Sequence, residues 1–127
     1  MLHFGMKGIP MSLENIRENV ERFWRAAHDR DVDAILTCFA AGAIAHDPVG
    51  SPPLETPEQL RAHFSGALSP FKTLAVSADM IKVCGDHSAT RWSIKGTTAE
   101  GSPLELEGID VTRHDEDGKI VSLMGFF

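Results

Sequence analysis

Asp47 is the first residue whose setting suggests chemistry beyond folding. It lies in a proline-rich loop with the sequence HDPVGSPP, residues 46–53. The residue before a proline is biased to extended backbone, and the prolines that follow restrict the loop further. The Asp47 carboxylate should therefore be held rather than loose, although an isolated Asp before Pro is also ordinary turn chemistry.

A second acid, Asp110, lies in a run that alternates along a predicted strand, residues 104–112. Because side chains alternate between the two faces of a strand, Asp110 shares its face with Leu104, Leu106 and Gly108. An acid on this mostly apolar face either pairs with a cation or keeps its proton, since desolvation raises its pKa. A structural, salt-bridged acid is thus the alternative to a functional one.

Other reactive residue types show no spacing typical of a site. The histidines lack a metal-binding pattern such as HExxH, and most are predicted to be surface or packing residues. This applies to His28, His63, His87 and His114. His46 adjoins Asp47, but consecutive residues of an extended chain point to opposite faces. Cys38 and Cys84 lie far apart without a CxxC motif, so neither a disulfide nor a metal site is expected.

Three helices are expected in the first half of the chain. From Ser12, taken as the N-cap, apolar residues recur at spacings of three and four as far as Ala27. A shorter helix is predicted over residues 32–40, with an aspartate near its start. The third begins at residues 56–59, Thr-Pro-Glu-Gln, where Thr and Gln form a capping box around a proline at the first helical position.

The second half predicts strands. Short apolar and β-branched runs are mostly separated by Gly, Asp, Ser and Pro. They cover residues 73–78, 80–84, 88–95, 104–112 and 120–126. The break at Asp79 is weak, so the first two runs are also compatible with one longer strand. Helices followed by strands indicate an α+β domain in which a curved sheet wraps against a helical layer and leaves a cone-shaped cavity.

The strand over residues 88–95 decides the character of that cavity. If Trp92 and Ile94 face inward, the cavity is apolar. A one-residue slip would turn Arg91 and Lys95 inward instead. Asp110 would then be salt-bridged and ionised, and the cavity would suit an anionic substrate. An inward sheet face usually carries the apolar set, so the register with Trp92 inward is favoured.

Composition narrows the class of protein. The 127 residues include 12 Lys and Arg against 18 Asp and Glu, a formal net charge of -6, with no basic run. This argues against nucleic acid or an anionic membrane as a partner. No apolar run could cross a bilayer and no signal peptide is evident, so a cytoplasmic location is expected. Residues 1–11 are expected to form a flexible leader, and residues 12–127 a single domain.

These residues resemble the ketosteroid isomerases of the larger NTF2-like and SnoaL-like superfamily, from about residue 19 to the end of the chain. The resemblance is carried by RDVDAI at 30–35, DPVGSPP at 47–53, GIDVTR at 108–113 and DEDGKI at 115–120. It implies an NTF2-like cone with three N-terminal helices packed on a curved, mixed but mainly antiparallel sheet that encloses a pocket. The proline-rich loop together with Asp110 is closer to the isomerases themselves than to the superfamily at large.

The resemblance implies a role for each acid. Asp47 matches a general base that removes a proton beside a carbonyl and returns it elsewhere on the allylic system. Asp110 matches a neutral carboxylic acid that donates a hydrogen bond to the developing enolate oxygen, as in the ketosteroid isomerases. The implied reaction moves a double bond of a small cyclic ketone into conjugation, and neither a cofactor nor a metal is expected.

One departure from the family is informative. Its main oxyanion donor is a tyrosine that falls on Phe23, and its supporting tyrosines fall on Phe39 and Phe64; the sequence contains no tyrosine. Losing one oxyanion donor typically costs about 2.7 to 4 kcal/mol, so Asp110 would act alone or with an indole N–H of Trp24 or Trp92. Two alternatives stay open: a SnoaL-like polyketide cyclase, and a non-catalytic protein that binds a small apolar ligand.

The expected pocket is lined by aromatic, aliphatic and small residues. They are Phe23, Trp24, Ala27, Phe39, Phe64, Trp92, Leu106, Gly108 and Phe127. By analogy with the fold, the exposed back of the sheet is expected to form a two-fold homodimer. The expected partners are a small apolar, ketone-like ligand and a second copy of the chain, with no nucleic acid and no membrane.

Overall fold

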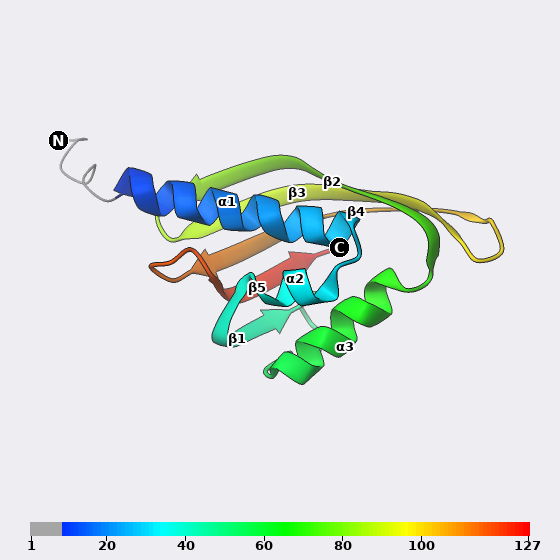
Figure 1. The fold of residues 1–127 in the computed structure, drawn as a ribbon, viewed down its shortest axis with the longest axis horizontal. Helices are drawn as coiled ribbons and strands as arrows, with labels where there is room; N and C mark the ends of the chain where they lie inside the picture. Colours follow the sequence, from blue (N-terminus) through cyan, green and yellow to red (C-terminus); the bar gives the residue numbers. More distant parts are fainter. Residues whose placement is uncertain (1–8) are drawn as a thin grey trace.

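The computed structural model describes residues 9–127, and Figure 1 shows a single sheet with helices on one face. In chain order the elements are α1 (Ile9–His28), α2 (Val32–Leu36), β1 (Phe39–His46), α3 (Pro57–Leu68), β2 (Phe71–Cys84), β3 (His87–Thr98), β4 (Pro103–His114) and β5 (Ile120–Phe126). This confirms the predicted α+β class. The described part of the chain holds no helix long and apolar enough to span a membrane.

The first helix starts earlier than predicted. Helix α1 begins at Ile9, so the expected N-cap at Ser12 is wrong, and three residues of the expected leader are helical. The remainder of that leader, residues 1–8, lies outside the described residues. The predicted apolar stripe is confirmed, because Ile16, Val20 and Phe23 are each less than 5% exposed. This stripe packs α1 on β2 and β3.

The caps of the next two helices follow the sequence signals. The Asp31 carboxylate accepts a hydrogen bond from the backbone N–H of Ala34 and so caps α2. At α3 the Thr56 side chain accepts from the Gln59 backbone N–H, while the Gln59 side chain accepts from the Thr56 backbone N–H. The capping box is therefore confirmed, and it fixes where α3 begins.

The sheet is mixed, in the order β1-β5-β4-β3-β2. Strand β1 runs parallel to β5, and every other neighbouring pair is antiparallel. The two runs around Asp79 form the single strand β2, with an irregularity between Ala78 and Met80. This confirms both the predicted mixed architecture and the longer-strand alternative.

Strand β1 is the element that the sequence patterns missed. The predicted helix over residues 32–40 ends at Leu36, and β1 starts at Phe39. Residues 40–45 read AAGAIA, a composition rich in residues that are depleted in strands. Pairing with β5 makes this segment a strand, so a tertiary contact overrides the local preference.

The register of β3 confirms the prediction that Trp92 faces inward. Trp92 is 5% exposed and pairs with Gly108 on β4, while Thr90 pairs with Asp110. Arg91 lies on the opposite, exposed face. A Cβ atom on Gly108 would collide with the Trp92 ring, so this glycine makes room for the indole. The inner face of β3 and β4 therefore carries one large aromatic ring and one acid side by side.

Candidate functional site

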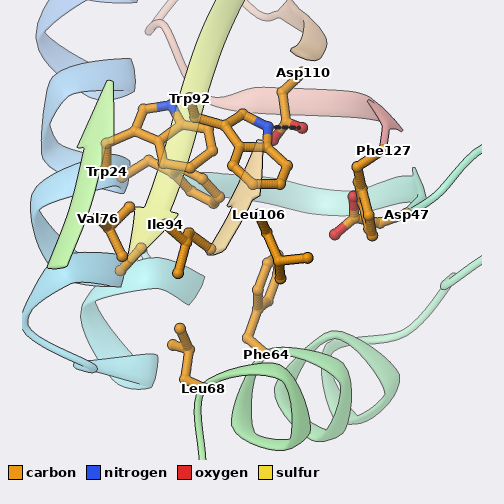
Figure 2. Close-up of a pocket in the computed structure, with 12 residues that line it drawn as sticks. Trp24, Asp47, Phe64, Leu68, Val76, Trp92, Ile94, Leu106, Asp110 and Phe127 are labelled. Carbon is orange, nitrogen blue, oxygen red and sulfur yellow. Dashed lines mark hydrogen bonds between the residues drawn. The ribbon is translucent and has the colours of Figure 1, made fainter. Parts of the chain in front are cut away.

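A cavity opens between the helices and the inner face of the sheet (Figure 2). About 600 Å³ of empty space lies in and around it, part of which is open to solvent. Its walls are formed by Phe23, Trp24, Ala27, Asp47, Phe64, Leu68, Val76, Trp92, Ile94, Leu106, Asp110 and Phe127. The lining is aliphatic and aromatic except for the two acids. Such a cavity suits a small, mostly apolar ligand with a few oxygen atoms.

Most of the predicted lining residues reach the cavity, with two exceptions. Phe39 lies behind the wall, where its ring contacts those of Phe23 and Phe64 at centroid distances of 6.1 and 5.9 Å. Gly108 lies beneath the Trp92 ring rather than on the wall. The sequence analysis also missed Leu68 and Val76, whose positions depend on how α3 and β2 approach the cavity.

Asp110 is buried on the inner face of β4 and is 6% exposed. Burial, and secondarily the negative charge of Asp47, raises the pKa of Asp110 to about 7. The Trp92 indole acts in the opposite direction, because its Nε1–H donates to Asp110 Oδ1 at 3.0 Å. The predicted raised pKa is thus supported, and burial rather than a cation controls the protonation state.

Asp47 sits across the cavity from Asp110, and its side chain is 12% exposed. The Asp47 side chain is largely buried because the loop folds against the sheet. The backbone N–H of Val49 donates to the Gly125 carbonyl at 2.8 Å, and Leu54 pairs with Ala45 on β1. These backbone bonds hold the proline-rich loop in place, as predicted from its sequence.

His63 contacts Asp47, which the sequence analysis did not anticipate. Its Nε2 atom lies 2.7 Å from Asp47 Oδ2. His63 packs on the Phe64 ring, as expected of a packing residue, and its contact with Asp47 is an addition that the sequence prediction lacked. A signal did exist: His63 lies three residues after the buried Leu60, so helical periodicity places it on the inward side of α3.

Gly125 on β5 is a second unpredicted part of the site. A Cβ atom at this position would overlap Asp47 Oδ1 and would lie 3.2 Å from the Phe127 ring. Only a glycine therefore leaves space for the Asp47 carboxylate above β5. Nothing in the sequence around residue 125 reveals this need, because the two residues belong to different elements.

Residues 20–123 match the family described as the SnoaL-like domain. The chain belongs to this family. Among solved structures, one match with 23% identity and a TM-score of 0.79 covers 89% of this chain and 90% of the other. Its title describes an epoxide hydrolase/cyclase-like enzyme, SalBIII, with a role in pyran ring formation in the polyether salinomycin. At this identity the likeness supports the shared cone fold.

Few side chains on the cavity wall of this SnoaL-like domain could donate a hydrogen bond to a ligand oxygen. Phe23 lines the cavity and carries no hydroxyl group. The Trp92 N–H is committed to Asp110, so the expectation that it substitutes as a donor to substrate is wrong. The Trp24 ring stacks on Trp92 at a centroid distance of 5.9 Å. Asp110 is thus the acid best placed to donate to a substrate oxygen.

The described residues of the SnoaL-like domain do not gather three or more His, Cys, Asp or Glu side chains into a group that could hold a metal ion. Cys38 is a buried free thiol and Cys84 an exposed one. The arrangement that remains is a pair of carboxyl groups in an apolar cavity, with a histidine behind one of them.

Proposed function

We propose that this SnoaL-like domain is a proton-transfer enzyme for a small, largely apolar cyclic ketone. Asp47 is the general base, and Asp110 is the neutral hydrogen-bond donor to the carbonyl oxygen. One observation carries this proposal: the two carboxyl groups share an otherwise apolar cavity, and the pKa of Asp110 is raised to about 7. Two acids whose surroundings separate their protonation states can divide the roles of base and acid.

The proposed reaction moves one proton. The Asp47 carboxylate removes a proton from the carbon beside the carbonyl, and the electron pair of that C–H bond moves toward the carbonyl oxygen. Asp110 donates a hydrogen bond to the enolate oxygen that forms. Asp47 then returns its proton to the far carbon of the allylic system, and the double bond ends in conjugation with the carbonyl. The enzyme is unchanged at the end of the cycle.

Trp92 supports this division of roles because it makes the two oxygens of Asp110 inequivalent. Its N–H donates to Oδ1, so Oδ1 acts as the acceptor and the acid proton belongs on Oδ2 (Figure 2). The same contact stacks the indole against Trp24 and closes the apolar wall. A neutral Asp110 held in this way is oriented before the substrate arrives, which is the condition for effective electrostatic stabilisation.

Ring closure is the second candidate, and the scarcity of donors favours it. With Phe23 in place of a hydroxyl donor, an enolate would be stabilised by Asp110 without the usual second donor. A ring closure needs no enolate: Asp47 removes the proton of a hydroxyl group as its oxygen attacks an epoxide carbon, the C–O bond of the epoxide breaks, and Asp110 protonates the oxygen released from that carbon. Proton exchange with solvent then returns Asp47 to its ionised form and Asp110 to its neutral form. The printed description of the structural neighbour as cyclase-like agrees with this chemistry.

The deciding experiment compares Asp47→Asn with the parent protein. The substrates are a β,γ-unsaturated 3-ketosteroid, followed by the ultraviolet absorbance of its conjugated enone, and a hydroxy-epoxide that closes to a cyclic ether. We expect turnover of one of them to fall by about a hundredfold to ten-thousandfold in Asp47→Asn. Asp86→Asn is the matched control, because Asp86 also lies 2.7 Å from a histidine nitrogen but on the surface.

Each result has a distinct meaning. Equal turnover by the parent and Asp47→Asn would overturn the proposed base. No turnover by the parent, with a steroid that still raises its unfolding temperature, would support the alternative of a non-catalytic ligand-binding protein.

A homodimer is the proposed assembly. The outer face of the sheet exposes Ile44, Ile109, Met124 and Phe126, each at 39% to 46%. Ile109 and Phe126 are direct cross-strand partners, so the apolar area is continuous over β4 and β5. A second copy could cover it by two-fold symmetry. Small-angle scattering should give the mass of a dimer for the parent and of a monomer for Ile109→Glu; a monomeric parent would overturn the proposal.

A further inference from the structure

We propose that His63 is a positioning residue for Asp47: it holds Oδ2 of the carboxylate so that Oδ1 is the oxygen presented to the substrate. The inference deepens the proposed function and rests on Asp47 acting as the base. Neither the family match nor the structural neighbour assigns a role to this residue.

The contact itself defines which atom donates. His63 Nε2 lies 2.7 Å from Asp47 Oδ2. An ionised carboxylate has no hydrogen to give, so a base-competent Asp47 must accept, and the hydrogen must be on His63 Nε2. Hydrogen bonds to an ionised acceptor are about twice as strong as neutral ones. The His63 N–H is therefore suited to fixing one carboxylate oxygen.

The second carboxylate oxygen is located by a different element. Asp47 Oδ1 lies directly over Gly125 on β5, so closely that a Cβ atom there would overlap it. The ring of Phe127, which lines the cavity, stands beside the same point. One oxygen is thus bonded to α3, while the other lies at the cavity side of the sheet. The two constraints together select one orientation of the carboxylate.

Such a constraint is needed because the terminal torsion of an aspartate is soft. Its χ2 angle is broadly distributed and roughly two-fold, so a carboxylate without a partner exchanges its oxygens readily. Proton abstraction requires the reacting atoms to be about 3 to 3.5 Å apart and aligned. A fixed Oδ2 converts a rotating carboxylate into a base with one defined basic atom.

His63 is itself held in place, which a positioning residue requires. The capping box at Thr56 and Gln59 fixes the start of α3, and the His63 ring packs edge-on against Phe64 at a centroid distance of 5.1 Å. Its side chain is 24% exposed, and it is not part of the cavity wall. His63 therefore acts through Asp47 and does not touch the substrate.

The surface pair Asp86 and His87 has the same kind of contact as Asp47 and His63, but it does not lie at a cavity. His87 Nδ1 lies 2.7 Å from Asp86 Oδ1, the same separation as in the cavity pair. Both side chains are more than half exposed, and the residues are adjacent in sequence. The Asp86 side chain is 61% exposed, so its carboxylate is open to solvent instead of facing an apolar cavity. It provides a natural control for the cavity pair.

The test uses two substitutions of His63 on the substrate that the Asp47 experiment identifies. His63→Leu removes the donor, and His63→Gln keeps an amide N–H at a similar reach. We expect kcat to fall by about tenfold to a hundredfold in His63→Leu with KM changed by less than about twofold, and most of kcat to return in His63→Gln. His87→Leu should leave both parameters unchanged.

A spectroscopic measurement keeps the proposal testable if His63→Leu folds poorly. Long-range proton–nitrogen NMR correlation of the parent should show the hydrogen of His63 on Nε2. In Asp47→Leu, which leaves no acceptor, the Nε2-bound hydrogen of His63 should lose the downfield chemical shift and the slow solvent exchange that a hydrogen bond to a carboxylate gives it. A parent protein with the hydrogen on Nδ1 alone would overturn the inference.

The kinetic outcomes separate this inference from the proposed function. If Asp47→Asn turns over as fast as the parent, the proposed function fails. If Asp47→Asn collapses while His63→Leu keeps the parent kcat, His63 does not position the base and only this inference fails. Equal losses in the Leu and Gln variants would likewise overturn it, because a retained N–H donor should rescue the orientation.

Discussion

The inner face of β3 and β4 carries a group of polar side chains at each of its two ends, and the two groups differ in their hydrogen bonding. At the cavity end, Trp92 donates to Asp110, whose second oxygen has no protein donor among the described residues. At the other end Ser88, Thr112 and His114 bond to one another, and each is at most 6% exposed. Both groups lie on the same two strands, are buried and are polar, so only their hydrogen-bond partners differ.

We call the end formed by Ser88, Thr112 and His114 the closed end, because its polar side chains are hydrogen-bonded within the protein. His114 Nδ1 lies 2.9 Å from the Gly118 carbonyl, which can only accept, so Nδ1 carries the hydrogen. Nε2 then accepts from the Thr112 hydroxyl at 2.7 Å. Burial lowers the pKa of His114, which keeps the ring neutral and the pattern stable. Since every group has an internal partner, this end serves the fold.

A shifted pKa does not by itself separate a structural polar group from a reactive one. Both ends contain buried titratable residues with shifted pKa values, and in both, desolvation is the largest cause. Only the cavity end leaves a carboxyl oxygen facing open space, with a second acid across from it. Asp110, and not His114, therefore has an oxygen available to a ligand, although the pKa values of both are shifted.

Among the changes beside the two acids rather than at Asp47 itself, the largest effect is expected from filling the space under Asp47. Gly125→Ala places a methyl group where Asp47 Oδ1 lies, so the carboxylate must move away from its aligned position. We expect kcat/KM to fall by about tenfold to a hundredfold. The control is Gly66→Ala on α3, because Gly66 has open space around its Cα and a helical backbone. Similar rates for both variants would contradict the role assigned to Gly125.

An intermediate effect is expected from pH. The proposed donor must be protonated, and the pKa of Asp110 is about 7. The kcat/KM of the parent should therefore fall as pH rises through 7, by about tenfold per pH unit above it. Asp110→Asn retains an N–H donor that does not titrate, so its pH profile should be flat from pH 7 to 9. An equal alkaline decline in the variant would show that another group titrates.

The same pKa makes a statement about stability. In the folded state the pKa of Asp110 is about 7, against an ordinary aspartate pKa of 3.8. Its contribution is fully present below about 3.8 and is lost as pH rises through 7, because the folded state holds a proton that the unfolded state has released. Urea unfolding should show Asp110→Asn gaining on the parent between pH 5 and 8, on the order of 2 kcal/mol. A constant difference would contradict the raised pKa.

The smallest effect on turnover is expected at the closed end. Thr112→Val removes the hydroxyl that donates to His114 Nε2 and leaves that buried nitrogen without its best partner. The free energy of unfolding should fall by about 1 to 3 kcal/mol, while kcat stays within about twofold of the parent. Thermal unfolding and a steady-state assay measure both. A large loss of kcat without loss of stability would erase the distinction between the two ends.

Local signals in the sequence predicted most of the architecture. The capping box at Thr56 and Gln59, the alternation around Asp110 and the inward register of Trp92 all appear in the structure as expected. Each depends on residues close together in the chain, through helix caps or the two-residue period of a strand. Strand β1 was not predicted, because its AAGAIA segment becomes a strand by pairing with β5 and not through its local composition.

The amino-acid sequence by itself determined that a held acid and a buried acid occur in an α+β domain with an apolar pocket. Only the tertiary structure decided which atoms meet them. His63 reaches Asp47 from α3, the next element along the chain, and Gly125 reaches it from β5, far along the chain. The raised pKa of Asp110 likewise needs the cavity walls and Asp47 around it. The physical reason is that desolvation, steric room and a 2.7 Å hydrogen bond are properties of packed surfaces, which no local residue pattern specifies.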